Sequence, residues 1–311
     1  MKTEMRPPAV VAMLRRIARA CSPPVFLAAA LGATLIGCRT TLPTSPNRDP
    51  GAARASSIRG TSELEATGSD RSRAEVFEGA CDIAAAIGAF RGALGTLNPN
   101  LPGSFGSGRR EINWDAVPAQ FTNVDNFPAD FFNQPAPGRA RGVVFSTPGS
   151  GFRTSDNNLA DLNPTYADEF DFFSPVRTFI AVGSNITTVQ FFVPGSGTPA
   201  TSTGFGVVFS DIEHPGSGRL RLFDAAGRDL GTYLAPACPG GFSFLGVKFP
   251  EPIVARVEIL SGQAALGPES FDVSSATTGP ARDLAIMDDF LYGEPIASPV
   301  QIGADAAVNF R

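Results

Sequence analysis

The stretch GRLRLFDAAGRDLGTYL, residues 218–234, decides the fold class. Leu220 and Leu222 alternate with Arg219 and Arg221, which is the two-residue period of a half-buried strand. The tetrapeptide DAAG then offers a tight turn, because its glycine can adopt a positive φ. A second apolar run follows the turn, so this stretch predicts a β-hairpin.

Short apolar runs separated by turn-forming residues continue along most of the chain. The 311 residues include 33 Gly and 27 Pro, a composition that suits short strands joined by tight turns. Strands are predicted at 111–115, 142–146, 178–182, 187–193, 205–210, 218–223, 229–234, 242–249, 253–260 and 284–292. About ten strands without helices between them predict an all-β, two-sheet sandwich of jelly-roll type over residues 96–311.

Residues 73–95 have a different periodicity. Apolar side chains recur there at three- and four-residue spacing, at Val76, Ala80, Ile83, Ala84, Ile87, Phe90 and Leu94. This spacing predicts one helix over about 75–94 that ends at Gly95. Its apolar face is expected to pack on the β domain.

The N-terminus has the features of a bacterial export signal. Arg15, Arg16 and Arg19 precede the uncharged run VFLAAALGATLIG, residues 25–37, which is too short to span a bilayer comfortably. The run leads into Cys38 through Leu-Ile-Gly, which resembles the lipobox of bacterial lipoproteins. The sequence thus predicts a signal peptide over 1–37 and a lipid on Cys38 that anchors the chain to the cell membrane or the outer membrane. An ordinary secretory signal cut nearby is the alternative.

Two details of this signal leave alternatives open. The Arg15-Arg16 pair is compatible with twin-arginine export, but the residues after it fit that pattern weakly, so general secretion is preferred. Met13 is an alternative start to Met1, because the charged region is long. Residues 38–72 are rich in Ser, Thr, Pro, Gly and Arg, so they are expected to form a flexible tether.

The net charge and the number of cysteines and histidines indicate which partners and metals the chain can bind. The net charge of −5 becomes more negative once the signal is removed, which disfavours a nucleic-acid partner and is compatible with cation binding. In an oxidising compartment Cys81 and Cys238 could form one disulfide, with two buried thiols as the alternative. Two cysteines and the single histidine, His214, make a zinc site improbable.

One group of candidate ligands surrounds the only tryptophan. In a strand, Glu111, Asn113 and Asp115 would share one face and Trp114 would lie on the other. Carboxylate and amide oxygens suit Ca²⁺, and the same groups suit sugar hydroxyls. The alternative is a solvated face backed by a buried tryptophan.

Two further pairs of acids are candidate ligands. Asp211 and Glu213 come at the end of a predicted strand, and Asp288 and Asp289 lie within the last one. Strand alternation predicts that Asp288 and Asp289 face opposite sides. A buried carboxylate needs a cation or hydrogen bonds, so we expect some of these acids to form a structural ion site.

Loops contribute other acids. Segments 156–161 and 168–171 are acid-rich and suit Ca²⁺, although neither matches a known calcium loop. Loop solvation and turn capping are the alternative. His214 precedes an apparent turn, and the sequence has no Gly-x-Ser-x-Gly nucleophile elbow between a strand and a helix. Both observations disfavour a Ser-His-Asp hydrolase.

Much of the chain matches a recurrent pattern. The matching runs are AFRGALG (89–95), RREINWD (109–115), VFSTPG (144–149), GF (151–152), NPTY (163–166), GFGVVF (204–209), SFLG (243–246) and MDDFLYGEP (287–295). Across 83–95 and 105–293 the chain resembles a family of uncharacterised exported bacterial proteins with a jelly-roll-like domain. This resemblance implies the fold and the location, and it implies no reaction.

Three functions remain open from the sequence. The first, preferred over an enzyme, is a membrane-anchored extracytoplasmic binding module for carbohydrate or another envelope polymer, stabilised by Ca²⁺. The second is a structural or assembly lipoprotein that binds other envelope proteins. The third is a glycoside hydrolase, which needs only two suitably spaced carboxylates.

Overall fold

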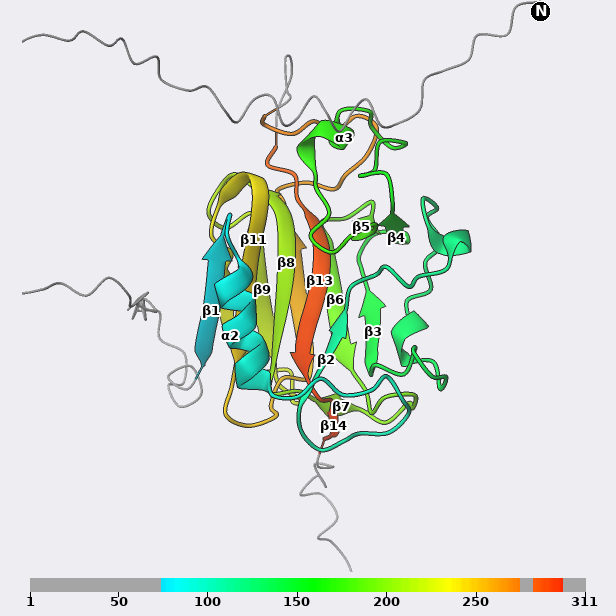
Figure 1. Cartoon of the computed structure of the whole chain (residues 1–311), viewed down its shortest axis with the longest axis vertical. Coiled ribbons are helices and arrows are strands. Elements are labelled where there is room, and N and C mark those ends of the chain that lie inside the picture. Colours follow the sequence, from blue (N-terminus) through cyan, green and yellow to red (C-terminus); the bar gives the residue numbers. More distant parts are fainter. Residues whose placement is uncertain (1–73, 275–281, 299–311) are drawn as a thin grey trace, which may run out of the picture. The chain divides into compact units, whose positions relative to one another are not determined.

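The structure is a computed structural model that describes residues 74–274 and 282–298 (Figure 1). The predicted signal peptide over 1–37, the lipid on Cys38 and the tether over 38–72 lie outside the described residues. None of the helices in the described part of the chain is long and apolar enough to cross a membrane.

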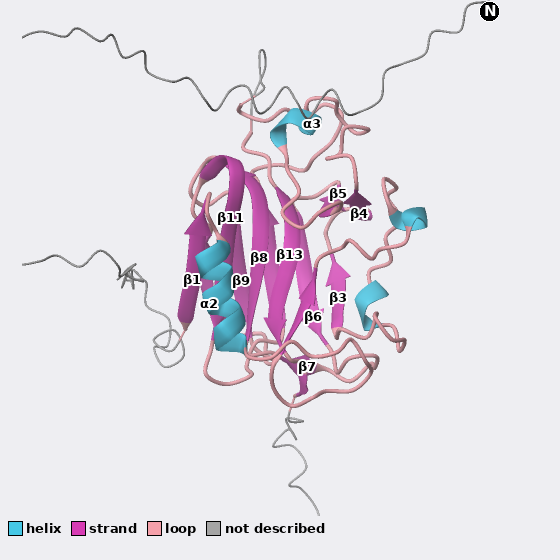
Figure 2. Ribbon diagram, viewed as in Figure 1, coloured by secondary structure: helices cyan, strands magenta, loops and turns pink. Residues whose placement is uncertain are grey.

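Two antiparallel sheets form the β domain (Figure 2). The first contains β1 (Glu75–Ala80), β2 (Arg109–Ile112), β4 (Gly151–Ser155), β5 (Thr178–Val182), β8 (Gly204–Ile212), β11 (Cys238–Lys248) and β13 (Ile286–Gly293). The second contains β3 (Val143–Ser146), β6 (Ile186–Phe191), β9 (Gly218–Phe223), β10 (Asp229–Leu234) and β12 (Arg256–Ser261). A separate short pair is formed by β7 (Ala200–Thr201) and β14 (Ile296–Ala297).

The strand order is that of a wound sandwich. The first sheet runs β1-β11-β8-β13-β5-β4 with β2 paired to β13, and the second runs β10-β9-β12-β6-β3. The chain passes from one sheet to the other after β2, β3, β5, β8, β10, β11 and β12, and also after β6 by way of β7. The protein is therefore an all-β sandwich of jelly-roll type, as the alternation predicts.

The hairpin that decided the fold class is present. β9 and β10 pair antiparallel, and Gly227 in the turn between them has a φ of 77°. Leu220 and Leu222 enter the core that the two sheets share, together with Val257 and Ile259 of the neighbouring β12. Arg219 and Arg221, which alternate with these leucines, remain exposed, because successive side chains of a strand point to opposite faces.

Trp114 lies at the centre of the aromatic core. Its ring stacks on Phe179 with centroids 3.9 Å apart and meets the edge of Phe290 at 5.2 Å. The indole Nε1 donates a hydrogen bond of 2.8 Å to the carbonyl oxygen of Asp288. Trp114 has a φ of 63°, so the predicted strand over 111–115 is too long: β2 ends at Ile112 and the chain turns to insert the ring.

The N-terminal helix is shorter than predicted. α2 (Ala84–Leu94) begins only after the edge strand β1, so the expected helix over about 75–94 is wrong over 75–83, nearly half of its length. β1 pairs with β11 along its whole length, and this pairing satisfies backbone groups that a helix would satisfy internally. α2 lies against one face of the first sheet (Figure 2). Its buried side chains Ile87, Phe90 and Leu94 pack there on Val208, Phe244 and Leu291, as expected for the apolar face.

Cys81 and Cys238 form a disulfide, with their Cα atoms 5.4 Å apart. The bond joins the turn between β1 and α2 to the first residue of β11 across a sequence separation of 157. It therefore fixes the edge strand and the helix to the sheet, and its main effect is expected to be a restriction of the unfolded chain.

Candidate functional site

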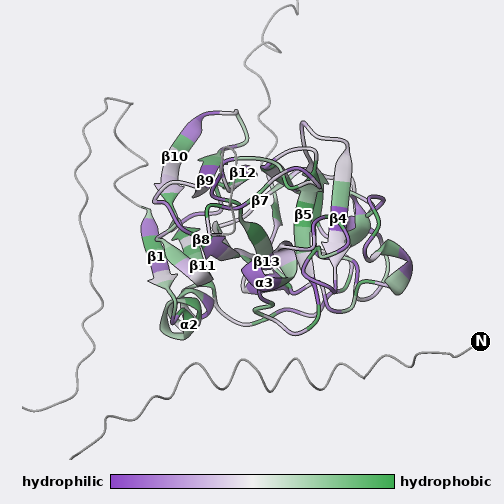
Figure 3. Ribbon diagram, turned by 90° about the horizontal axis from the view of Figure 1, so that it is seen from above, coloured by the Kyte–Doolittle hydropathy of each residue, from purple (hydrophilic) through white to green (hydrophobic). Residues whose placement is uncertain are grey.

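Five carboxylates converge at the end of the sandwich that carries α3 (Tyr166–Glu169). Figures 1 and 3 place α3 beside the start of β13. We call this group the acidic cluster; its members are Glu169, Asp211, Glu213, Asp272 and Asp283. Glu169 ends α3, Asp211 and Glu213 come from the end of β8, and the other two come from loops that precede β13.

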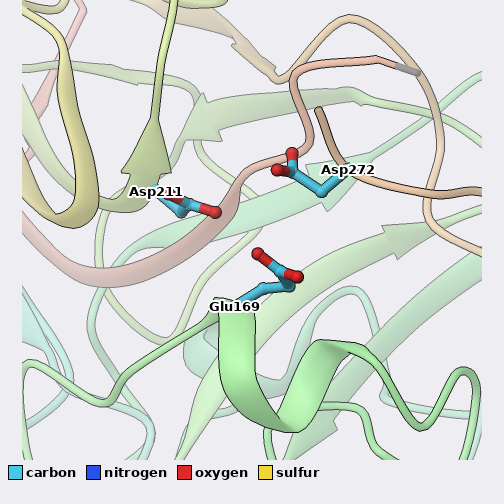
Figure 4. Close-up of side chains that lie close together, drawn as sticks. All are labelled: Glu169, Asp211 and Asp272. Atoms are coloured by element: carbon cyan, nitrogen blue, oxygen red, sulfur yellow. The ribbon is translucent and has the colours of Figure 1, made fainter. Parts of the chain in front are cut away.

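The acidic cluster consists of two overlapping triples. In the first triple, one ligand oxygen from each of Glu169, Asp211 and Asp272 lies within 4.8 Å of the other two. Figure 4 shows these three carboxyl groups directed toward one another. In the second triple, Glu213, Asp272 and Asp283 meet the same limit. Asp272 belongs to both triples.

Most of this negative charge is buried. Asp211 is 1% exposed, and Asp272 and Asp283 are both 0% exposed. When these carboxyl groups are ionised, Oδ2 of Asp211, Oδ1 of Asp283 and both carboxylate oxygens of Glu213 have no hydrogen-bond donor among residues 74–274 and 282–298. A buried polar atom without a partner costs about 1–3 kcal/mol, and more when it carries charge. The arrangement is therefore incomplete without a proton or a cation.

Like charges in a buried place disfavour ionisation. Burial, with the nearby charges of Asp272 and Glu169, raises the pKa of Asp211 to about 7. Burial also raises the pKa of Glu213 to about 11, together with direct contacts to the carboxyls of Asp283 and Asp272. These directions describe the cation-free protein, in which protons take the place of a cation.

Basic side chains compensate little of this charge. Within residues 74–274 and 282–298, His214 is the only basic residue with a nitrogen within 4.0 Å of a cluster carboxylate; its Nδ1 lies 3.3 Å from Oδ2 of Asp283. The His214 side chain is itself 55% exposed, so it lies at the margin of the cluster.

Backbone donors hold the carboxylates in place. The N–H of Gly240 donates to Oδ1 of Asp211 at 2.6 Å, and Asp211 has a φ of 69°, which is uncommon outside glycine. Oδ2 of Asp283 accepts hydrogen bonds from the N–H groups of Glu213 and His214. The other oxygens of these two residues, Oδ2 of Asp211 and Oδ1 of Asp283, are buried and have no donor among the described residues.

Asp272 is held by donors on both of its oxygens. The N–H of Leu284 donates to Oδ1 at 2.8 Å, and the N–H of Ser274 donates to Oδ2 at 2.8 Å. The hydroxyl of Ser274 contacts both Oδ2 of Asp272 and Glu169. This network fixes the carboxylate that the two triples share.

The donor set indicates which cation fits. All candidate ligands are carboxylate oxygens, which hard cations prefer, whereas zinc sites in proteins use mainly nitrogen and sulfur. Ca²⁺ binds oxygens at 2.3–2.6 Å, so two oxygens on one ion lie at most about 5 Å apart. The 4.8 Å limit within each triple is compatible with this value. The residues present therefore fit Ca²⁺.

Three of the predicted ligands lie in a second acidic group beside α2. Asp288 and Asp289 were expected to face opposite sides of β13, and this is wrong. The pairing register of β13 with β8 shifts between Met287 and Phe290, so the two aspartates fall at a β-bulge and their side chains contact each other. Arg91 lies 3.9 Å from Oδ2 of Asp289 and also binds Glu111.

Arginines compensate this second group. Arg91 and Arg109 both donate to Oε1 of Glu111, at 2.9 and 2.7 Å. Although burial opposes ionisation, these hydrogen bonds lower the pKa of Glu111. The bound arginines make the second group a poorer place for a cation than the acidic cluster.

Asn113 and Asp115 do not join Glu111 on one strand face, because β2 ends before them. Nδ2 of Asn113 donates to Oδ2 of Asp115 at 3.0 Å, and Asn113 is exposed. The predicted three-residue face is therefore not formed: Glu111 lies in β2, whereas Asn113 and Asp115 lie in the turn after it.

Asp288 offers a prediction about pH. Burial and the charge of Asp289 raise the pKa of Asp288 to about 8, above the roughly 3.9 expected in the unfolded chain. Its protonation should therefore stabilise the fold fully below about pH 4 and stop doing so as pH rises through about 8, at up to about 1.4 kcal/mol per pH unit. Asp288→Asn should lose less unfolding free energy than the parent between pH 5 and pH 8, measured with urea in EDTA.

Exposed Glu251 provides the control for this experiment, since Glu251→Gln should keep the parent's pH dependence. Equal slopes for Asp288→Asn and the parent would show that Asp288 is ionised in the folded protein at neutral pH.

Sequence reasoning found only part of the acidic cluster. It named Asp211 and Glu213, and it noted the acid-rich segment that contains Glu169. It missed Asp272 and Asp283, which lie in loop sequence without periodicity. The signal that could have drawn attention to them is their place on either side of a Ser-, Thr- and Gly-rich segment before the last strand.

No family model and no curated protein matches the chain. A solved structure with a weak likeness is the enzymatically active domain of tailspike protein 4 from bacteriophage CBA120. The TM-score is 0.26 and the sequence identity 14%, and the match covers 56% of this chain but 21% of the tailspike chain. A likeness at this level carries no inference about activity.

Proposed function

We propose that this chain is an exported, lipid-anchored binding module, with carbohydrate or another envelope polymer as its ligand and Ca²⁺ bound in the acidic cluster. The observation that carries the Ca²⁺ part is the set of buried carboxylate oxygens in Asp211, Glu213 and Asp283 that have no donor within the described part of the chain. A divalent cation would satisfy these atoms and offset their mutual repulsion.

Bound Ca²⁺ would join segments that are far apart in sequence. The acidic cluster draws on α3, the end of β8 and the loops before β13. An ion there would stiffen this end of the sandwich, where loops dominate, and rigid loops on a sandwich are suitable for ligand binding. The Cys81–Cys238 disulfide agrees with export, because such bonds persist in oxidising compartments.

Thermal unfolding tests the cation. Calcium at about 100 times its Kd should stabilise the folded state by about 2.7 kcal/mol relative to EDTA. For a domain of this size that corresponds to a rise in Tm of about 5–10 °C. Asp272→Asn should lose most of this rise and Glu251→Gln should keep it. An unchanged Tm for the parent protein in Ca²⁺ would refute the cation.

Two further experiments test the ligand and the anchor. Retention on immobilised envelope polysaccharides should be seen in Ca²⁺ and should fall in EDTA, whereas absence of retention on all polysaccharides would refute a carbohydrate ligand. Cys38→Ala should abolish incorporation of labelled fatty acid and release the chain from membranes. Persistent membrane attachment of this variant would refute the lipid anchor.

A further inference from the structure

The geometry of the acidic cluster sets a limit on how many of its members one ion can bind. Oxygens that share one Ca²⁺ lie within about 5 Å of one another. In the described part of the chain, the sets that meet a 4.8 Å limit are the two triples, and each contains three of the five carboxylates. One ion placed in the first triple would leave the carboxylates of Glu213 and Asp283 without a bound cation.

Each triple has its own unsatisfied buried atom. The first triple contains Asp211, a residue 1% exposed whose Oδ2 has no partner among the described residues, and the second contains Asp283, a residue 0% exposed whose Oδ1 has none there. Both oxygens of Glu213 add to the second triple. Because buried polar atoms are normally paired, each triple independently points to a missing ligand.

Asp272 is suited to serve two ions. Each of its oxygens accepts a hydrogen bond from a different N–H group, Oδ1 from Leu284 and Oδ2 from Ser274. A carboxylate has about four lone-pair sites, so these bonds leave acceptor capacity for metal ions. Asp272 is also the only residue common to both triples.

The total charge of the acidic cluster also favours two divalent ions over one. Five ionised carboxylates with one divalent ion would retain three negative charges in a largely buried place, where, among the described residues, the exposed His214 is the basic side chain within 4.0 Å. Two divalent ions would leave one, a far smaller penalty in a medium of low dielectric constant.

We infer that the acidic cluster binds two Ca²⁺ ions that share Asp272, one held by Glu169 and Asp211 and the other by Glu213 and Asp283. This inference rests on the proposed function, because it specifies how the same cluster binds its cation. Water and backbone carbonyls would complete each coordination shell, since Ca²⁺ takes six to eight oxygens.

Isothermal titration of the full chain with Ca²⁺, after removal of metal with EDTA, tests the stoichiometry. Two ions per chain are expected. Glu169 and Glu213 are partly exposed and each belongs to one triple, so Glu169→Gln and Glu213→Gln can be made with little risk to the fold. Each should weaken one site at least tenfold and leave one tight site, whereas Asp272→Asn should weaken both.

Glu251→Gln is the matched control and should bind two ions like the parent protein. One ion per chain in the parent would overturn the shared arrangement but leave Ca²⁺ binding intact. No binding at all would overturn the proposed cation as well. Two undiminished sites in both Glu169→Gln and Glu213→Gln would overturn the assignment of residues.

Discussion

Glu294→Ala is expected to lower the unfolding free energy by about 3–5 kcal/mol, because it leaves a buried arginine without its counter-charge. Arg110 of β2 is 0% exposed, and its Nε and Nη2 each donate to a carboxylate oxygen of Glu294 at 2.8 Å. Arg110 also donates to the carbonyls of Ala140 and Gly103, which cannot neutralise the guanidinium. Urea unfolding followed by circular dichroism would measure the loss.

The matched control for this prediction is a surface pair. Arg256 and Glu258 form an ion pair on β12 with side chains 30% and 34% exposed, so Glu258→Ala should cost no more than about 1 kcal/mol. The double variant Arg110→Met with Glu294→Leu should recover much of the stability lost in Glu294→Ala. Equal losses for Glu294→Ala and Glu258→Ala would show that burial of the pair contributes nothing.

The sheet strands could be predicted because alternation is a local property. Every one of the ten predicted strands has a counterpart, and β5, β9 and β10 have the predicted bounds. The sequence pattern predicts helix at β1 because Val76 and Ala80 extend the helical spacing of α2. β1 is a strand because it pairs with β11. The two strands are far apart in sequence, so the local pattern of residues cannot predict this pairing.

The candidate site was less predictable for a related reason. Asp211 and Asp272 are far apart in sequence and meet only because the chain crosses between the sheets. The bulge at Asp288 and Asp289 changes which way their side chains point, and nothing in the local pattern marks it. Residue type identified some ligands, whereas their grouping depends on topology.

Trp114→Ala is the other substitution expected to have a large effect, about 3–5 kcal/mol of unfolding free energy. Trp114 is 1% exposed and also contacts Phe127, Phe132 and Phe145, at centroid distances of 5.9, 5.6 and 5.8 Å. Removing the indole leaves a cavity among rings that belong to several strands and loops, and these cannot all move inward together. Circular dichroism is the suitable probe, because the variant has no tryptophan.

Trp114→Phe separates packing from hydrogen bonding. The smaller ring keeps most of the aromatic contact with Phe179 but cannot donate to the carbonyl oxygen of Asp288. Its cost should be about 1–3 kcal/mol, the penalty of one unpaired buried acceptor, and it should stay below the cost of Trp114→Ala. If both variants lost the same stability, the hydrogen bond to β13 rather than the aromatic packing would determine the role of Trp114, because the cavity would then add nothing to the loss.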